Sequence, residues 1–150
     1  MRERLSEELK SAMKAKDTRV TATVRLIIAA LKDRDIAARG KDNAEGISET
    51  EILKMLQTMV KQRRESIELY ENGGRLDLAQ QEQEEIEIIR RFMPTQLSEE
   101  EVARAVTEIV SETGAESLKD MGRTMAALRE RYAGQMDFAK ASAMVKAQLS

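Results

Sequence analysis

The sequence lacks both cysteine and histidine. Without cysteine, the chain has no disulfide, no thiol nucleophile and no thiolate metal ligand. Without histidine, it lacks the side chain that most often acts as a general base and binds transition metals. These absences exclude Ser-His and Cys-His nucleophile pairs, and we expect neither a metal site nor a bound cofactor.

Aromatic residues are also scarce. Tryptophan is absent, and the chain has two tyrosines and two phenylalanines. Proteins that bind single-stranded nucleic acid stack bases on aromatic rings, so this shortage argues against base stacking. The net charge of −2 excludes a strong overall attraction to nucleic acid or to an anionic membrane. Any contact with RNA must therefore come from locally gathered cations, which would recognise backbone and shape.

Long hydrophobic runs are missing as well. No stretch approaches the ~20 apolar residues that span a bilayer, so we expect no membrane partner. The first residues, Met1 to Glu8, are too acidic for a transit peptide and lack the apolar core of a signal peptide. From these features we expect a cytoplasmic protein.

The residues that are abundant favour helices. Charged residues make up 35% of the chain and there is one proline, a composition typical of an all-α protein. Apolar spacing and end signals predict seven helices. They cover about 2–15, 18–39, 48–72, 76–92, 99–112, 118–132 and 137–150. The second helix is apolar nearly all round at Leu26 to Leu31, with Ile36 on its stripe, which suggests burial on several sides. Leu118 is expected to point inward from the sixth helix.

The single proline marks a joint between two helical parts. Pro94 lacks an amide hydrogen and its ring clashes with the preceding turn, so the fourth helix should end near Phe92. Ser98 and Glu101 form a capping box that starts the next helix. We predict a four-helix N-terminal domain, a joint that acts as a hinge, and a small three-helix bundle tail domain. Their ranges are 1–93, 94–97 and 98–150.

An acidic cluster crowds the fourth helix at Glu82, Glu84, Glu85 and Glu87. Carboxylates at this density could hold a magnesium ion. We favour a solvated acidic face, because acidic side chains abound on exposed helix surfaces. Partial pairing with nearby arginines is expected, and the candidates are Arg75, Arg90 and Arg91.

Methionines recur at helical spacing in two parts of the chain, at 55, 59, 121, 125, 136 and 144. Flexible methionine side chains can form an adaptable groove for a partner protein. More often such residues fill the core, and we favour that interpretation.

Two sets of basic residues could contact RNA phosphates. One set lies on the second helix, at 19, 25, 32 and 39. The other ends the most basic stretch of the third helix, where Lys61, Arg63 and Arg64 lie close together. The alternative is an ordinary solvated surface, in which Glu65 and Glu68 offset these charges.

Five motifs, in this order along the chain, resemble those of the GatB/YqeY family. They are Arg25-Leu26-Ile27-Ile28-Ala29-Ala30-Leu31-Lys32, Val60-Lys61-Gln62-Arg63-Arg64-Glu65-Ser66-Ile67-Glu68, Gly74-Arg75-Leu76-Asp77-Leu78-Ala79 followed by Glu82 and Glu85-Ile86, Phe92-Met93-Pro94-Thr95-Gln96-Leu97-Ser98, and Asp120-Met121-Gly122-Arg123-Thr124-Met125. Met93 replaces the family's usual leucine, and Phe138 stands where family members commonly have glycine.

The resemblance implies a larger helical domain followed by a three-helix tail. A similar region is appended to the catalytic body of the B subunit of glutamine-dependent aspartyl/glutamyl-tRNA amidotransferase, where the tail engages the tRNA. The family label is carbon–nitrogen ligase with glutamine as amido donor. The body that carries this chemistry is missing here, and the chain has no Gly-rich phosphate loop and no amidase nucleophile system. No self-contained catalytic site is found.

The leading hypothesis is therefore an accessory tRNA-binding module that acts on tRNA or an aminoacylation complex. The predicted RNA-contacting residues are Lys61, Arg63, Arg64, Lys119, Arg123 and Arg129. In the tail, Lys119 and Arg123 lie one turn apart, and Gly122 lets a partner backbone approach closely. A helical adaptor for a protein partner is the second hypothesis. A free-standing amide-forming enzyme ranks last.

Overall fold

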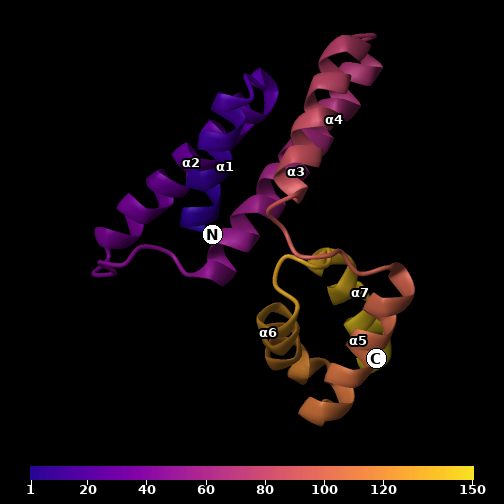
Figure 1. Ribbon diagram of the computed structural model, residues 1–150. Helices are drawn as coiled ribbons and strands as arrows, with labels where there is room; N and C mark the ends of the chain where they lie inside the picture. The colour runs from indigo at the N-terminus through magenta and orange to yellow at the C-terminus, as the bar shows by residue number, and fades with distance from the viewer. The chain divides into compact units, whose positions relative to one another are not determined.

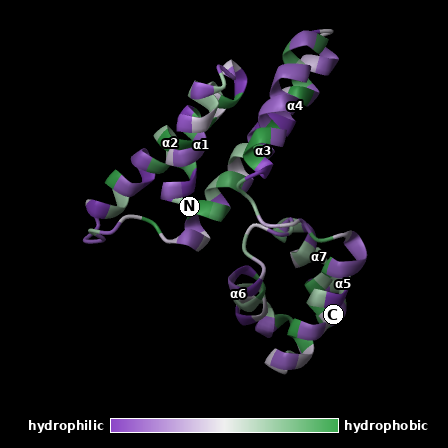
Figure 2. Ribbon diagram, viewed as in Figure 1, coloured by the Kyte–Doolittle hydropathy of each residue, from purple (hydrophilic) through white to green (hydrophobic).

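The computed structural model describes residues 1–150 as seven α-helices and one short 3-10 helix, with no strand (Figure 1). The predicted all-α class is thus confirmed. The chain divides into two compact units, Met1–Pro94 and Thr95–Ser150. Apolar and polar residues alternate around the helices of both units (Figure 2). None of the helices is long and apolar enough to cross a membrane.

The first unit consists of two helical hairpins. Helix α1 pairs with α2, α3 pairs with α4, and α2 also packs against α4 and α3. The four helices are α1 (Arg2–Lys14), α2 (Thr18–Arg39), α3 (Glu49–Asn72) and α4 (Leu76–Arg90). They share one core, in which Val24, Ile27, Ile52, Leu56 and Ile89 are fully buried.

Side-chain caps fix where two of these helices begin. Asp17 accepts a hydrogen bond from the amide of Val20 at the start of α2, as predicted. Ser48 and Glu51 form the predicted capping box at the start of α3. These caps satisfy amides that have no partner within the helix.

The prediction that the centre of α2 is buried on several sides is wrong. Leu26 is 48% exposed and Ile36 is 65% exposed. The buried positions of α2 follow one face at helical spacing, because only the side toward α1, α3 and α4 is covered. Ile28, Ala30 and Ala38 are partly buried against this core, whereas Leu26 and Ile36 face solvent.

The first unit closes just before the proline. Helix α4 ends at Arg90, and the next residues form a turn. In this turn the amide of Arg91 donates to the carbonyl of Ile88, and the amide of Phe92 donates to the carbonyl of Ile89. Phe92 is buried in the core of the first unit and Met93 packs against it, as expected. The predicted joint at 94–97 lies across the boundary between the two units, and its role as a hinge stays a prediction.

The second unit is a bundle of three helices that pack against one another. They are α5 (Glu99–Thr113), α6 (Met121–Arg131) and α7 (Phe138–Leu149). The capping box of Ser98 and Glu101 starts α5 as predicted, and Gly114 ends it in the left-handed conformation (φ 65°). Leu97 packs against the core of this bundle, and its amide donates to the carbonyl of Gln135.

The predicted sixth helix begins differently. Residues Leu118–Asp120 form the 3-10 helix η1, and the α-helix starts only at Met121. Leu118 is 48% exposed, so its predicted inward position is wrong. The tighter turn changes the angular spacing of side chains, and the apolar periodicity of α6 therefore does not extend back to Leu118.

Candidate nucleic-acid interface

The three predicted RNA contacts on α3 have different surroundings. Arg63 is bound to α4: its Nε lies 3.1 Å from Oε2 of Glu85, and its Nη1 donates to the carbonyl of Met59 at 3.3 Å. The side chains of the pair are only 13% and 14% exposed. Lys61 and Arg64 are exposed and form no ion pair. Arg63 thus holds the α3–α4 hairpin together, and Lys61 and Arg64 are available to a ligand.

The acidic cluster of α4 faces arginines of neighbouring helices. Glu85 pairs with Arg63, and Glu84 lies 3.3 Å from Arg19 of α2. The expected pairing with Arg75, Arg90 or Arg91 is wrong, because Arg75 pairs instead with Asp77. No three carboxylates come together as a metal site.

Glu82 of the same cluster is half-buried and forms no ion pair. Burial raises the pKa of its carboxyl, and the negative charge of Glu85 raises it further. The expected solvated acidic face is therefore only partly correct, because Glu87 is exposed while Glu85 is mostly buried and Glu82 is half-buried.

In the second unit, Asp120 organises the turn between α5 and α6. Its carboxylate accepts the amides of Glu116 at 2.9 Å and Ser117 at 3.2 Å, and these hydrogen bonds lower its pKa. Arg123 lies 3.1 Å from the same carboxylate and donates to the carbonyl of Thr113 at 2.6 Å. The motif that begins at Asp120 therefore has a structural role, because it holds the residues that follow the end of α5.

A strip of exposed residues runs along the outer side of η1 and α6. Its members are Lys119 of η1 and three residues of α6, Gly122, Ala126 and Arg129, which recur at intervals of four and three residues and share a helix face. A Cβ added at Gly122 would meet no atom within 4 Å. The strip thus has small residues, glycine and alanine, between two exposed cations.

Arg129 lies against an aromatic ring of α7. Its guanidinium carbon is 6.0 Å from the centroid of Phe138, the residue at which this chain departs from the family pattern. A cation–π contact of this kind orients the arginine side chain and leaves its hydrogen-bond donors available. Phe138 also packs against the core of the second unit.

The methionines are core residues, as we favoured. Met55, Met59, Met125 and Met136 are buried, and Met121 and Met144 pack against the core of the second unit. The six do not form an exposed groove.

An ion pair between α1 and α2 was not predicted from the sequence. Asp35 is buried, and its Oδ1 and Oδ2 accept hydrogen bonds from Arg2 at 2.7 and 3.2 Å. The amide of Ile47 also donates to Asp35 at 2.9 Å. The hydrogen bond from Arg2 is the main cause that lowers the pKa of Asp35. The helical spacing could have indicated that Asp35 is buried, because it lies four residues after Leu31 on the buried face of α2.

Comparison with known proteins decides the family. The family model described as Yqey-like protein matches residues 2–149. The chain belongs to the Yqey-like protein family. The family resemblance inferred from the five motifs is thereby confirmed.

The relatives of this Yqey-like chain include three fungal proteins, each named "Altered inheritance of mitochondria protein 41, mitochondrial". The protein of Lachancea thermotolerans is 29% identical over 97% of this chain and 76% of its own length. That of Eremothecium gossypii is 36% identical over 67% of this chain and 55% of its own length. That of Clavispora lusitaniae is 33% identical over 74% of this chain and 63% of its own length. The chain thus spans less than two thirds of the last two.

The expected cytoplasmic location is contradicted by these relatives, whose names place them in mitochondria. The expectation rested on the acidic character of Met1 to Glu8, on their lack of an apolar core and on the lack of long hydrophobic runs. N-terminal residues of this kind bear only on the presence of a targeting segment, and a targeting segment is recognised separately from the fold. The helical architecture itself carries no information about the compartment.

Proposed function

We propose that this Yqey-like protein is an accessory RNA-binding module that contacts the backbone of tRNA, alone or within an aminoacylation complex. The observation that carries the proposal is the exposed strip of α6. Gly122 and Ala126 let a sugar–phosphate backbone approach closely, and Lys119 and Arg129 can pair with phosphates on either side. The one ring beside the strip, that of Phe138, is half-buried and lies against Arg129, so recognition would rest on backbone and shape.

Lys61 and Arg64 provide a second pair of exposed cations on α3. Arg63 and Arg123 already bind groups within their own unit, so RNA contact by these two stays a prediction. The proposal therefore rests on the other four cations. The relation to the tRNA amidotransferase enters at the level of the family, and we propose no amide-forming activity for this chain alone.

A titration with tRNA tests the proposal. Fluorescence anisotropy with labelled tRNA should give tighter binding than a random duplex at physiological salt, with an affinity that falls as salt rises. The double variant Lys119→Ala/Arg129→Ala removes two proposed phosphate contacts. It should reduce the slope of log K against log salt by about 1.8 if each phosphate contributes about 0.9.

The matched control is Lys10→Ala/Lys41→Ala, which removes two exposed lysines far from the proposed contacts in the sequence. It should leave the slope unchanged. Equal affinity for tRNA and the random duplex, or equal slopes for the two double variants, would refute the proposal.

A further inference from the structure

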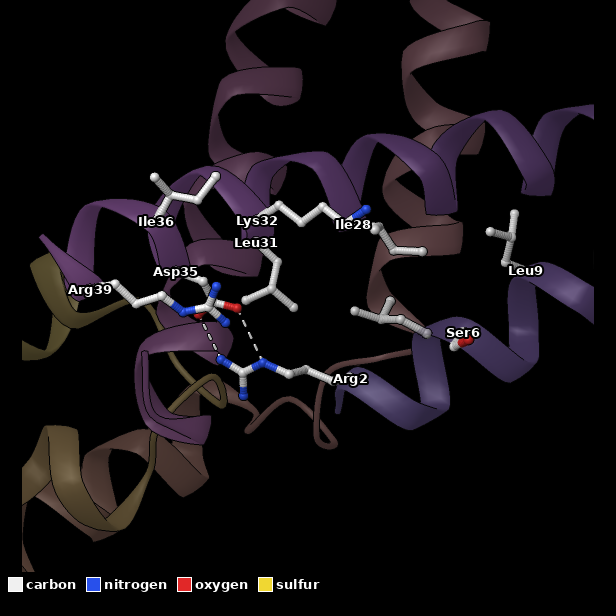
Figure 3. Close-up of a pocket in the computed structure, with 10 residues that line it drawn as sticks. Arg2, Ser6, Leu9, Ile28, Leu31, Lys32, Asp35, Ile36 and Arg39 are labelled. Carbon is white, nitrogen blue, oxygen red and sulfur yellow. Dashed lines mark hydrogen bonds and ion pairs between the residues drawn. The ribbon is translucent and has the colours of Figure 1, made fainter. Parts of the chain in front are cut away.

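The α1–α2 hairpin carries a groove that the proposed RNA contacts do not use. Its volume is about 630 Å³. Leu5 and Leu31 form a buried floor, and Leu9 and Ile28 are the half-buried walls. Figure 3 shows Leu9, Ile28 and Leu31 between the two helices, with Arg2 joined to Asp35 at one end.

The rim of the groove is exposed and mixes apolar and cationic side chains. Ile36 is 65% exposed. Along α2, Lys32 lies about one turn before Ile36 and Arg39 lies almost one turn after it. An exposed isoleucine alone is ordinary. Here it lines the same groove as the buried leucines of the floor, and apolar side chains gathered in this way mark interaction sites.

The dimensions of the groove match a helix. On α2 the lining residues run from Ile28 to Arg39 and recur every three or four residues, so they cover three turns, or about 16 Å. On α1 the lining residues recur in the same way from Arg2 to Leu9. A third helix laid between two antiparallel helices would contact both and complete a three-helix bundle.

The charge of the groove determines what that helix must carry. The lining contains three cations, Arg2, Lys32 and Arg39, and one carboxylate, Asp35. Asp35 is already satisfied by Arg2 and by the amide of Ile47, so no acidic group remains for a basic partner. Lys32 and Arg39 form no ion pair, and the charge of Arg39 also helps to lower the pKa of Asp35. Both cations would attract carboxylates along one edge of an occupant.

We propose that the α1–α2 groove docks an acidic amphipathic helix of a partner protein. The apolar face of that helix would cover Leu9, Ile28 and Ile36, and its Asp or Glu residues would pair with Lys32 and Arg39. Nucleic acid fits poorly here, because a phosphate backbone would leave the apolar walls without a partner and no aromatic ring is present for stacking.

A peptide selection on the full chain tests this. The probe is a phage-displayed library of peptides about 15 residues long, with leucines fixed at i, i+3, i+4 and i+7 and all other positions random. The peptides recovered should carry an excess of Asp and Glu beside the leucine face. Their affinity should fall at least about tenfold for Ile36→Glu and for Lys32→Glu, each of which changes an exposed side chain.

Leu26→Glu is the matched control, because Leu26 is an exposed apolar residue of the same helix that does not line the groove. It should bind the selected peptides as the unmodified chain does, and circular dichroism should show full helicity in all three variants. Recovery of peptides without acidic excess, or binding that survives both groove substitutions, would overturn the proposal. Concentration-dependent self-association that Ile36→Glu abolishes would assign the groove to a second copy and would also overturn it.

Discussion

Arg2 and Asp35, 33 residues apart in the sequence, join the start of α1 to the last turns of α2 through two hydrogen bonds of 2.7 and 3.2 Å. The same guanidinium donates to the carbonyl of Ile47 at 2.9 Å, and the amide of Ile47 donates back to Asp35. One ion pair therefore fixes two helices and the loop that leads into α3. The α1–α2 groove begins at this ion pair (Figure 3).

Asp35→Asn should lower the free energy of unfolding by about 1–2 kcal/mol at pH 7, because a charged hydrogen-bond acceptor is replaced by a neutral one. The lowered pKa of Asp35 means that its contribution is present above the ordinary value of 3.8 and is lost as the pH falls through the lower folded value. Urea unfolding at several pH values should thus show the variant and the unmodified chain converging in acid. Asp33→Asn, on the exposed side of α2, should change little at any pH.

Gly46→Ala should destabilise the first unit more than Gly74→Ala does. Both glycines have positive φ, at 85° and 74°, so both substitutions carry the same backbone penalty of about 1 kcal/mol. A Cβ at Gly46 would also lie 2.3 Å from Oδ1 of Asp35, whereas one at Gly74 would meet nothing within 4 Å. We expect Gly46→Ala to cost about 1–3 kcal/mol more. Equal urea midpoints for the two variants would show that the Arg2–Asp35 contact is not rigid.

Arg63→Ala should cost about 2–3 kcal/mol of stability, because it leaves the mostly buried carboxylate of Glu85 without its cation. Lys61→Ala, two residues away on the exposed face, should stay within about 0.5 kcal/mol of the unmodified chain. Thermal unfolding measures the stability of the two variants. A loss in Arg63→Ala alone would show that Arg63 holds the hairpin, whereas Lys61 is free to contact RNA as proposed. A stable Arg63→Ala variant would contradict the structural role.

Glu82→Gln should stabilise the protein at neutral pH. Burial raises the pKa of Glu82 above its ordinary 4.5, so its ionisation opposes folding at any pH above that ordinary value. The penalty disappears as the pH falls below the raised folded pKa, and the advantage of the variant should vanish below pH 4.5. Glu87→Gln changes an exposed carboxylate of the same cluster and serves as the control in the same unfolding series. A Glu82→Gln variant that is less stable at pH 7 would contradict this account.

Local signals in the sequence predicted most helix ends. Asp17, Ser48 and Ser98 cap helices as expected, because a cap depends on a few adjacent residues. The start of α6 was misplaced because Asp120 binds two backbone amides, and this favours a 3-10 turn over a longer α-helix. Leu26 and Ile36 were misjudged because apolar residues reveal a helix face, but not whether another element covers it.

The candidate site was harder to predict, because it depends on which cations the fold already uses. Arg63 and Lys61 are equally basic in the sequence, and only the packing of α4 distinguishes them. Likewise, Arg123 is bound by Asp120 while Lys119 is exposed without an ion pair. Pairings between distant segments, such as Arg2 with Asp35, leave no local pattern beyond a charged residue on a buried helix face.

The most direct test of the proposed RNA contact is an amide chemical-shift titration of the isotope-labelled full chain with tRNA at physiological salt. The amides of Gly122 and Ala126, at the centre of the exposed strip, should shift or broaden as tRNA is added. The amide of Gly74, at the tip of the α3–α4 hairpin, should remain unchanged. Unchanged signals at Gly122 and Ala126, with perturbations elsewhere or nowhere, would contradict the proposal.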